Sequence, residues 1–214
     1  DLNAENRDLL GSEQLAWIKN SVLKTDAVWT IFGQQILMAK LKFPDLSKMI
    51  ASGEIPSFLK PYLKFLGLGI PSNLDAWDGY PAERNKLYKL MNGANKKFIS
   101  LAGDTHNSWV SELEDLSGKK VGVELGAPSV TSPGITDILS LDKAKFVNSI
   151  VKINKELQWM DPSNRGYLSL DCRKTKIIAS FNFIKEIERI NPEIGSSQSF
   201  VLLQEELGLE EIKA

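Results

Sequence analysis

The stretch Phe98-Ile-Ser-Leu-Ala-Gly-Asp-Thr-His106 decides the fold around it, because a short apolar run stops at a glycine and gives way to polar residues. Such a run predicts a buried strand over residues 98–102 that ends at Gly103. Asp104 and His106 follow two positions apart, a spacing that puts both side chains on the same side of an extended segment. A carboxylate and an imidazole that converge at the end of a strand can hold a cation or a phosphate-bound metal.

His106 is the only histidine in the chain, and a single histidine also has a less specific explanation. Histidine is common both at protein surfaces and within packed interiors. The residues alone therefore leave a metal ligand and an ordinary packed or surface histidine as alternatives.

The sequence before this stretch alternates between helix and strand signals. Apolar residues at helical spacing after Ser12, a residue suited to cap a helix, predict a helix over residues 13–24. Residues 27–32 are almost continuously apolar and rich in β-forming residues, which predicts a strand buried on both faces. Four prolines cut residues 36–74 into short helices or loops, and Pro81 begins a further predicted helix that ends near residue 92.

The second half of the sequence is dominated by paired strand signals. Strands are predicted over residues 108–113 and 120–125, and a second hairpin over residues 167–172 and 176–183. Between the two hairpins, a helix from about residue 142 to 157 has one apolar face. That face consists of Phe146, Ile150, Ile153 and Leu157. Helices and strands that alternate before a series of hairpins predict a layered α/β domain rather than a helix bundle.

Composition narrows the class of protein. The chain has 214 residues, of which 43% are hydrophobic and 25% charged, as in an ordinary globular domain. Its net charge is −1, without a basic stripe, so we expect no nucleic-acid-binding surface. No apolar run is long enough for a membrane span. A single cysteine, Cys172, excludes an internal disulfide and a cysteine-based metal cluster.

Five strings of residues, in a fixed order, carry a family resemblance. They are Arg7–Trp17, Trp77–Arg84, Leu101–Trp109, Val123–Gly134 and Asn164–Tyr167. Together they resemble the C-terminal half of the alkaline phosphatase D (PhoD-like) family, a branch of the metallophosphoesterases. The resemblance covers residues 7–183 and is weaker in the tail over residues 184–214.

The resemblance implies a fold and a reaction. The fold would be α/β (α+β): residues 1–214 would be the C-terminal portion of a four-layer α/β/β/α sandwich whose N-terminal half is absent. The metals would lie at the C-terminal ends of the strands. The reaction would be the hydrolysis of phosphomonoesters or phosphodiesters by a metal cluster, of calcium with iron, or with zinc or manganese in its place. Family members are commonly exported, which implies a periplasmic or extracellular location.

Particular residues are implied as well. The Gly-Asp-x-His string of the family supplies metal ligands, which correspond to Asp104 and His106. Gln34 stands at a strand end where this branch commonly has Asn-Gln, so it is a candidate third ligand; it could equally bond loop backbone. Tyr80 and Arg84 are candidate substrate-binding residues, Arg84 as a phosphate clamp. Alternatively, Tyr80 anchors the start of a helix and Arg84 lies on its solvated face.

The first half of the family's chain supplies the remaining ligands, in strings that are absent here. A metal cluster needs more than two good ligands. The sequence therefore predicts a phosphoester hydrolase that is incomplete without its N-terminal half as a partner. The alternative is a non-catalytic binding or scaffold module that keeps the fold without a complete metal centre.

Overall fold

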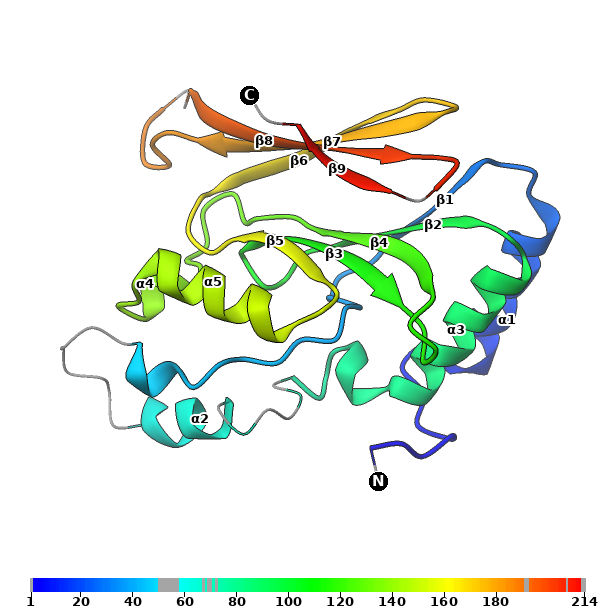
Figure 1. The fold of residues 1–214 in the computed structure, drawn as a ribbon, viewed down its shortest axis with the longest axis horizontal. Coiled ribbons are helices and arrows are strands. Elements are labelled where there is room, and N and C mark those ends of the chain that lie inside the picture. The colour runs from blue at the N-terminus through cyan, green and yellow to red at the C-terminus, as the bar shows by residue number, and fades with distance from the viewer. Residues whose placement is uncertain are drawn as a thin grey trace.

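The computed structural model describes residues 2–49, 58–66, 68, 71, 73–190, 193–206 and 208–212. Two β-sheets lie face to face, and helices cover the side of the first sheet that points away from the second (Figure 1). The predicted α/β fold class is confirmed. Part of the loop region predicted over residues 36–74 lies outside the described residues.

The first sheet has five strands in the order β1-β2-β4-β3-β5. They are β1 (Trp29–Gly33), β2 (Lys97–Ala102), β3 (Ser108–Glu114), β4 (Lys120–Gly126) and β5 (Leu157–Asp161). β2 is parallel to both β1 and β4, whereas β3 is antiparallel to β4 and β5. Because β2 and β4 are parallel, the segments that follow their carboxyl ends begin at the same edge of the sheet. The Ala127 N–H, which donates to the Ala102 carbonyl at 2.8 Å, joins these two segments.

The second sheet is antiparallel, with four strands in the order β6-β7-β8-β9. They are β6 (Gly166–Cys172), β7 (Lys176–Ile184), β8 (Ile194–Leu203) and β9 (Leu209–Ile212). Every second residue of β7 is buried, as expected for a strand with one face on a core. The core between the sheets includes Ile99, Val110, Val123 and Leu125 from the first sheet and Ile177, Ala179, Phe181 and Phe183 from the second.

The other face of the second sheet carries several polar side chains. The Ser180 and Ser199 hydroxyl oxygens lie 2.8 Å apart, and the Asn182 amide donates to the Ser169 hydroxyl at 3.0 Å. In the part of the chain that the structure describes, no helix lies over this face (Figure 1). These residues therefore form three layers, two sheets and one layer of helices.

Two helices cover the outer face of the first sheet near β1. α1 (Gly11–Lys24) and α3 (Pro81–Gly93) enclose a core with Phe98, Leu113 and Val121 of the sheet. The remaining helices are α2 (Leu59–Leu66), α4 (Ile135–Ile138) and α5 (Lys143–Ile153), with short 3₁₀ turns η1 (Leu46–Lys48) and η2 (Trp77–Gly79). None of the described helices is both long and apolar enough to cross a membrane.

The strand predicted over residues 27–32 differs from the structure in position and in burial. β1 begins at Trp29 and lies at the edge of the sheet, where Ile31 is 41% exposed. Phe98 and Ile99, in contrast, lie on the interior strand β2 and are fully buried. An apolar run indicates a strand, but its place in the sheet depends on which other segments pair with it.

The start of α1 also differs from the prediction. Leu10, not Ser12, occupies the N-cap position, and its side chain makes no capping hydrogen bond. Instead, a carboxylate oxygen of Glu83, on α3, accepts the backbone N–H groups of Leu9 and Leu10. A long-range carboxylate therefore binds the N-cap N–H, as the glutamate of a capping box does locally.

The helix predicted over residues 142–157 and the tail need corrections too. α5 ends at Ile153, which is 44% exposed, and Leu157 begins β5, a strand that the sequence pattern missed. The tail, where the sequence pattern predicted no element, supplies β8 and β9 of the second sheet. The hairpins of β3 with β4 and of β6 with β7 agree with the prediction.

Candidate functional site

The loop that follows β2 carries Asp104 and His106. Their φ angles are 64° and 61°, so both residues have left-handed backbone and the segment is not extended. The predicted reason for their convergence, alternation along an extended segment, is therefore wrong. Non-glycine residues with positive φ are uncommon, are enriched in Asp, Asn and His, and cluster at functional sites. Two in one short loop mark it as a candidate site.

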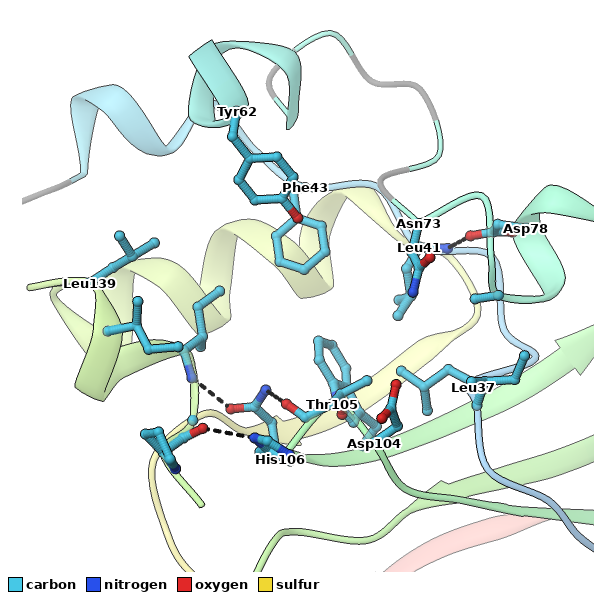
Figure 2. A pocket seen from close by; sticks show the side chains of 18 of the residues that line it. Leu37, Leu41, Phe43, Tyr62, Asn73, Asp78, Asp104, Thr105, His106 and Leu139 are labelled. Atoms are coloured by element: carbon cyan, nitrogen blue, oxygen red, sulfur yellow. Dashed lines mark hydrogen bonds between the residues drawn. The ribbon is translucent and has the colours of Figure 1, made fainter. Parts of the chain in front are cut away.

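His106 is oriented by a second loop, the one that follows β4. Its Nδ1 lies 3.0 Å from the carbonyl oxygen of Pro133 (Figure 2). A carbonyl oxygen can only accept, so Nδ1 carries the proton and Nε2 of the neutral ring keeps its lone pair. Histidines that ligate metals usually donate their other ring N–H to a carbonyl or carboxylate. His106 thus has the tautomer that a metal ligand acting through Nε2 requires.

Neighbouring contacts hold the loop in this shape. The Trp109 indole N–H donates to the Thr105 hydroxyl at 2.7 Å. The Asn107 amide donates to the Thr105 carbonyl at 2.5 Å, and its oxygen accepts the Ile135 N–H at 3.1 Å. A Cβ at Gly134 would lie 2.7 Å from that same Asn107 oxygen. The two loops are therefore packed so closely that a side chain at position 134 would force a shift in its neighbours.

A pocket of about 330 Å³ opens above this loop. Figure 2 shows Asp104 and His106 on one side of it and Phe43 and Tyr62 on the opposite side. The Asp104 carboxylate is exposed and makes no hydrogen bond or ion pair with any other residue that the structure describes. An unpartnered carboxylate and an imidazole with an open lone pair thus belong to one pocket.

Gln34 lies outside the lining of that pocket. Its side-chain oxygen accepts the Trp77 indole N–H at 2.6 Å, and its nitrogen donates to the Ser100 hydroxyl at 2.8 Å. An amide oxygen has two lone pairs, so one remains. The Gln34 side chain therefore links the end of β1 to Trp77 of η2 and to Ser100 of β2.

Arg84 is 4% exposed, so its alternative placement on a solvated helix face is wrong. Its Nη1 donates to an Asp78 carboxylate oxygen at 2.7 Å and to the Met38 carbonyl at 3.0 Å. Tyr80 occupies the N-cap of α3, which agrees with the alternative that it anchors the helix start. The Arg7 guanidinium lies 4.8 Å from the centre of its ring. Neither Tyr80 nor Arg84 lines the pocket.

Sequence reasoning missed a group of polar side chains that fix one wall of the pocket. The segment Met38–Lys42, which we call the strap, is held through its five consecutive backbone N–H groups. The Glu124 carboxylate accepts the first two at 2.7 and 2.8 Å; Glu156, Asp78 and Asn154 accept the next three at 3.0, 3.0 and 2.7 Å. Side-chain oxygens thus accept the five backbone N–H groups that would otherwise need backbone carbonyls as partners.

Glu124 is fully buried on β4. Burial raises the pKa of its carboxyl group to about 7, although the hydrogen bonds from Ala39, Met38 and Ser100 act in the opposite direction. The available signal was a single acidic residue within the otherwise uncharged segment Val121–Gly126. That signal does not say which backbone the carboxylate would bind.

These features define a class, a layered α/β domain with a shaped polar loop at the carboxyl ends of parallel strands. Comparison with known proteins gives the family. A family model described as "PhoD-like phosphatase" matches residues 1–181. The chain therefore belongs to the PhoD-like phosphatase family, whose members are phosphoester hydrolases.

Two relatives support the assignment. The chain is 28% identical to "Alkaline phosphatase D" of Bacillus subtilis (strain 168), over 98% of this chain and 32% of that protein. A solved structure titled "Structure of PhoD" superposes with a TM-score of 0.73 at 26% identity, over 98% of this chain and 36% of that one. The chain thus spans about a third of the length of the relatives it matches.

Proposed function

We propose that this chain supplies Asp104 and His106 as metal ligands to the active site of a phosphoester hydrolase that acts on phosphomonoesters or phosphodiesters. The observation that carries the proposal is the contact of His106 Nδ1 with the Pro133 carbonyl. That carbonyl accepts a hydrogen bond from Nδ1–H and leaves Nε2 open, in the same pocket as the unpartnered Asp104 carboxylate.

The donor chemistry suits the implied metals, but the number of donors is small. A carboxylate suits calcium, and an imidazole suits iron or zinc. Within the described ranges, no three or more His, Cys, Asp or Glu side chains are grouped so that they could hold a metal. We therefore propose that the remaining ligands come from an N-terminal half that lies outside this chain. The cluster would contain calcium with iron, or zinc or manganese.

Bound metals would stabilise negative charge on the phosphoryl oxygens and lower the pKa of an attacking water. The chain's own residues would hold the metals and keep the metal ligands in position. Asp104 and His106 would bind metal rather than act as acid and base. Thr105 and Asn107 would maintain the loop, and Pro133 would fix the imidazole ring.

The other candidate residues take more limited parts in this proposal. Gln34 would be a third ligand through its second lone pair while it keeps its bond to Trp77. Tyr80 lies outside the pocket lining, and Arg84 would contact substrate only if it left Asp78. Because Arg84 is buried, we favour a role in which it orders the strap through Asp78.

We propose β1 as the surface that the N-terminal half would meet. Among the residues described, β1 pairs with β2 alone, so its other edge is open to a further strand. Open edges of this kind readily accept a strand or self-associate. A periplasmic or extracellular location belongs to the same proposal on family resemblance, and fractionation of cells that express the intact protein would test it.

The decisive experiment compares bound metal and turnover in the intact protein and in its Asp104→Asn and His106→Ala variants. Under the proposal, both variants lose metal and lose hydrolysis of a chromogenic phosphomonoester and phosphodiester. The second candidate function, a non-catalytic binding or scaffold module, draws support from the small number of grouped ligands. An intact protein that contains no metal and hydrolyses neither ester, yet folds normally, would favour that module.

A further inference from the structure

The polar loop and most of the apolar residues that line the pocket lie on different sides of it. The loop Asp104–Asn107 forms one side. Most of the rest is apolar, from the strap and the segments around α2 and α4. These apolar residues include Leu41, Phe43, Tyr62, Leu63, Ile138 and Leu139. A pocket with one polar end and an apolar body fits a ligand that is built the same way.

Few of the polar groups in the lining are open to a ligand. The Thr105 hydroxyl accepts from Trp109, and the Asn107 side chain is bonded to Thr105 and Ile135. Both carboxylate oxygens of Asp78 are occupied, one by Arg84 and one by the Leu41 N–H. Asp104 and the Nε2 atom of His106 are therefore open to a ligand at one end of the pocket. On other segments of the lining, the Tyr62 hydroxyl and the Asn73 amide nitrogen make no hydrogen bond with any residue that the structure describes.

Two parts of the apolar wall are held by neighbouring residues. Phe43 stacks on Phe146 with ring centres 6.4 Å apart, and Phe146 is fully buried. α4 is held at its start, where Asp137 accepts the Gly134 N–H at 2.8 Å and also pairs with Arg165. Ile138 on α4 and Tyr62 on α2 are nevertheless 62% and 52% exposed. Large apolar side chains at the mouth of a preformed pocket mark a binding surface.

We propose that this pocket binds the uncharged apolar group of a phosphoester substrate, an aromatic ring or a branched alkyl group, while the phosphoryl group faces Asp104 and His106. The placement of the phosphoryl group rests on the proposed function; the apolar preference rests on the lining alone. A cavity of about 150 Å³ can hold benzene, so a pocket of about 330 Å³ has room for a ring together with its phosphoryl group. A sugar or glycerol group has more hydroxyls than the Tyr62 hydroxyl and the Asn73 amide could pair, and each hydroxyl left without a partner carries a cost.

Binding, not turnover, gives the direct test. 4-Fluorophenylphosphonate and 2-hydroxyethylphosphonate carry the same charged group and differ in the polarity of the other. We expect the aryl compound to bind the intact protein, with its metals, about tenfold more tightly, as estimated from the area that one ring buries. Fluorine and backbone amide NMR would measure both affinities and show whether the signals of residues 103–107 and 135–139 respond.

One variant and a matched control locate the effect. Ile138→Asn places an amide at the mouth of the pocket, and Ile190→Asn makes the same change at a residue that is 89% exposed and not part of the lining. We expect the preference for the aryl compound to fall to about twofold or less in the first variant and to persist in the second. Thermal unfolding would confirm that both variants fold.

The outcomes separate the two proposals. Equal affinity for the two phosphonates, or an aryl preference that survives Ile138→Asn, would overturn the pocket assignment. If the aryl preference is present and the His106→Ala variant of the intact protein keeps its metal, the pocket stands and the proposed metal site fails. If metal is lost as expected but no aryl preference exists, the metal site stands and the pocket assignment fails.

Discussion

His106 Nδ1 lies 3.0 Å from the carbonyl oxygen of Pro133, so the loop after β4 sets the orientation of a side chain on the loop after β2. The two residues are 27 positions apart in sequence. The parallel pairing of β2 with β4 brings their loops to one edge of the sheet. The site is thus assembled by strand order as much as by the string that contains the histidine.

Removal of either candidate ligand should affect metal more than folding. In the intact protein, we expect Asp104→Asn and His106→Ala each to lower metal affinity at least about tenfold, with turnover falling in parallel. Stability should change by less than about 1 kcal/mol, because neither side chain belongs to an apolar core. Elemental analysis and denaturant unfolding would check both parts. Full metal content with full turnover in both variants would contradict the assignment.

Gly134→Ala should loosen the contact between the two loops. The new Cβ would lie 2.7 Å from the Asn107 side-chain oxygen and 3.0 Å from the Pro162 carbonyl, so either the Asn107 side chain or the loop that carries Pro133 must shift. We expect a loss of about 1–3 kcal/mol in the free energy of unfolding, together with a changed Nδ1 signal of His106 by NMR.

Gly93→Ala is the matched control, because a Cβ there meets nothing within 4 Å at the end of α3. It should leave stability unchanged or raise it by up to about 1 kcal/mol. A Gly134→Ala variant as stable as this control would show that the loops can separate without cost.

Ile99 and Ile31 offer a comparison of two strand positions. They are paired across β2 and β1, but Ile99 is fully buried and Ile31 is 41% exposed. We expect Ile99→Ala to lower the free energy of unfolding by about 2–5 kcal/mol. Ile31→Ala should cost less than about 1 kcal/mol. Urea unfolding of both variants would measure the difference, and equal costs would argue against an edge position for β1.

The ionisation of Glu124 should make stability depend on pH. Burial raises the pKa of this carboxyl group from 4.5 to about 7. Between these values the folded protein binds a proton that the unfolded chain does not. The contribution is therefore complete below pH 4.5 and is lost as pH rises through 7. At about 1.36 kcal/mol for each pKa unit, the change is roughly 3 kcal/mol.

Unfolding midpoints in urea between pH 4.5 and 8 would follow this loss. Glu124→Gln should flatten the slope and lower stability by about 1–3 kcal/mol, because an amide nitrogen cannot accept the strap's N–H groups. Glu210→Gln, an exposed change on β9, is the control and should keep the slope. A slope that persists in Glu124→Gln would assign it to another group.

By itself, the 214-residue chain should show no appreciable phosphatase or phosphodiesterase activity. Two protein ligands hold a metal weakly and position no hydroxide for attack. The assay is hydrolysis of a chromogenic phosphomonoester and a phosphodiester, with calcium plus iron and separately with zinc or manganese. A separately produced N-terminal half should restore turnover. EDTA-sensitive turnover by the pure chain alone would contradict this prediction.

The sequence predicted the fold where local pattern determines structure. Phe98 and Ile99 are buried on an interior strand as their run indicated, and the hairpins followed from paired strand signals around turns. Ile31 has a similar composition around it, but its exposure depends on which strands pair with β1. That information is not local.

The candidate site was predicted by residue type but not by geometry. The string that contains Asp104 and His106 identified the loop, yet its left-handed backbone has no simple sequence signal. The strap was missed because its partners are distant: Lys42 and Asn154, for example, are 112 positions apart. Long-range polar contacts of this kind follow from the completed fold.

The strap has a consequence for how the family could diversify. The strap is held by side chains that accept hydrogen bonds from main-chain N–H groups: those of Glu124, Glu156, Asp78 and Asn154. Every amino acid except proline provides such an N–H group. Side chains on and beside the strap line the pocket and could be exchanged without loss of those hydrogen bonds. Ligand preference could then drift during evolution while the scaffold stays constant, and a library randomised at Leu37, Ala39 and Leu41 should retain folded members with altered selectivity but few with proline.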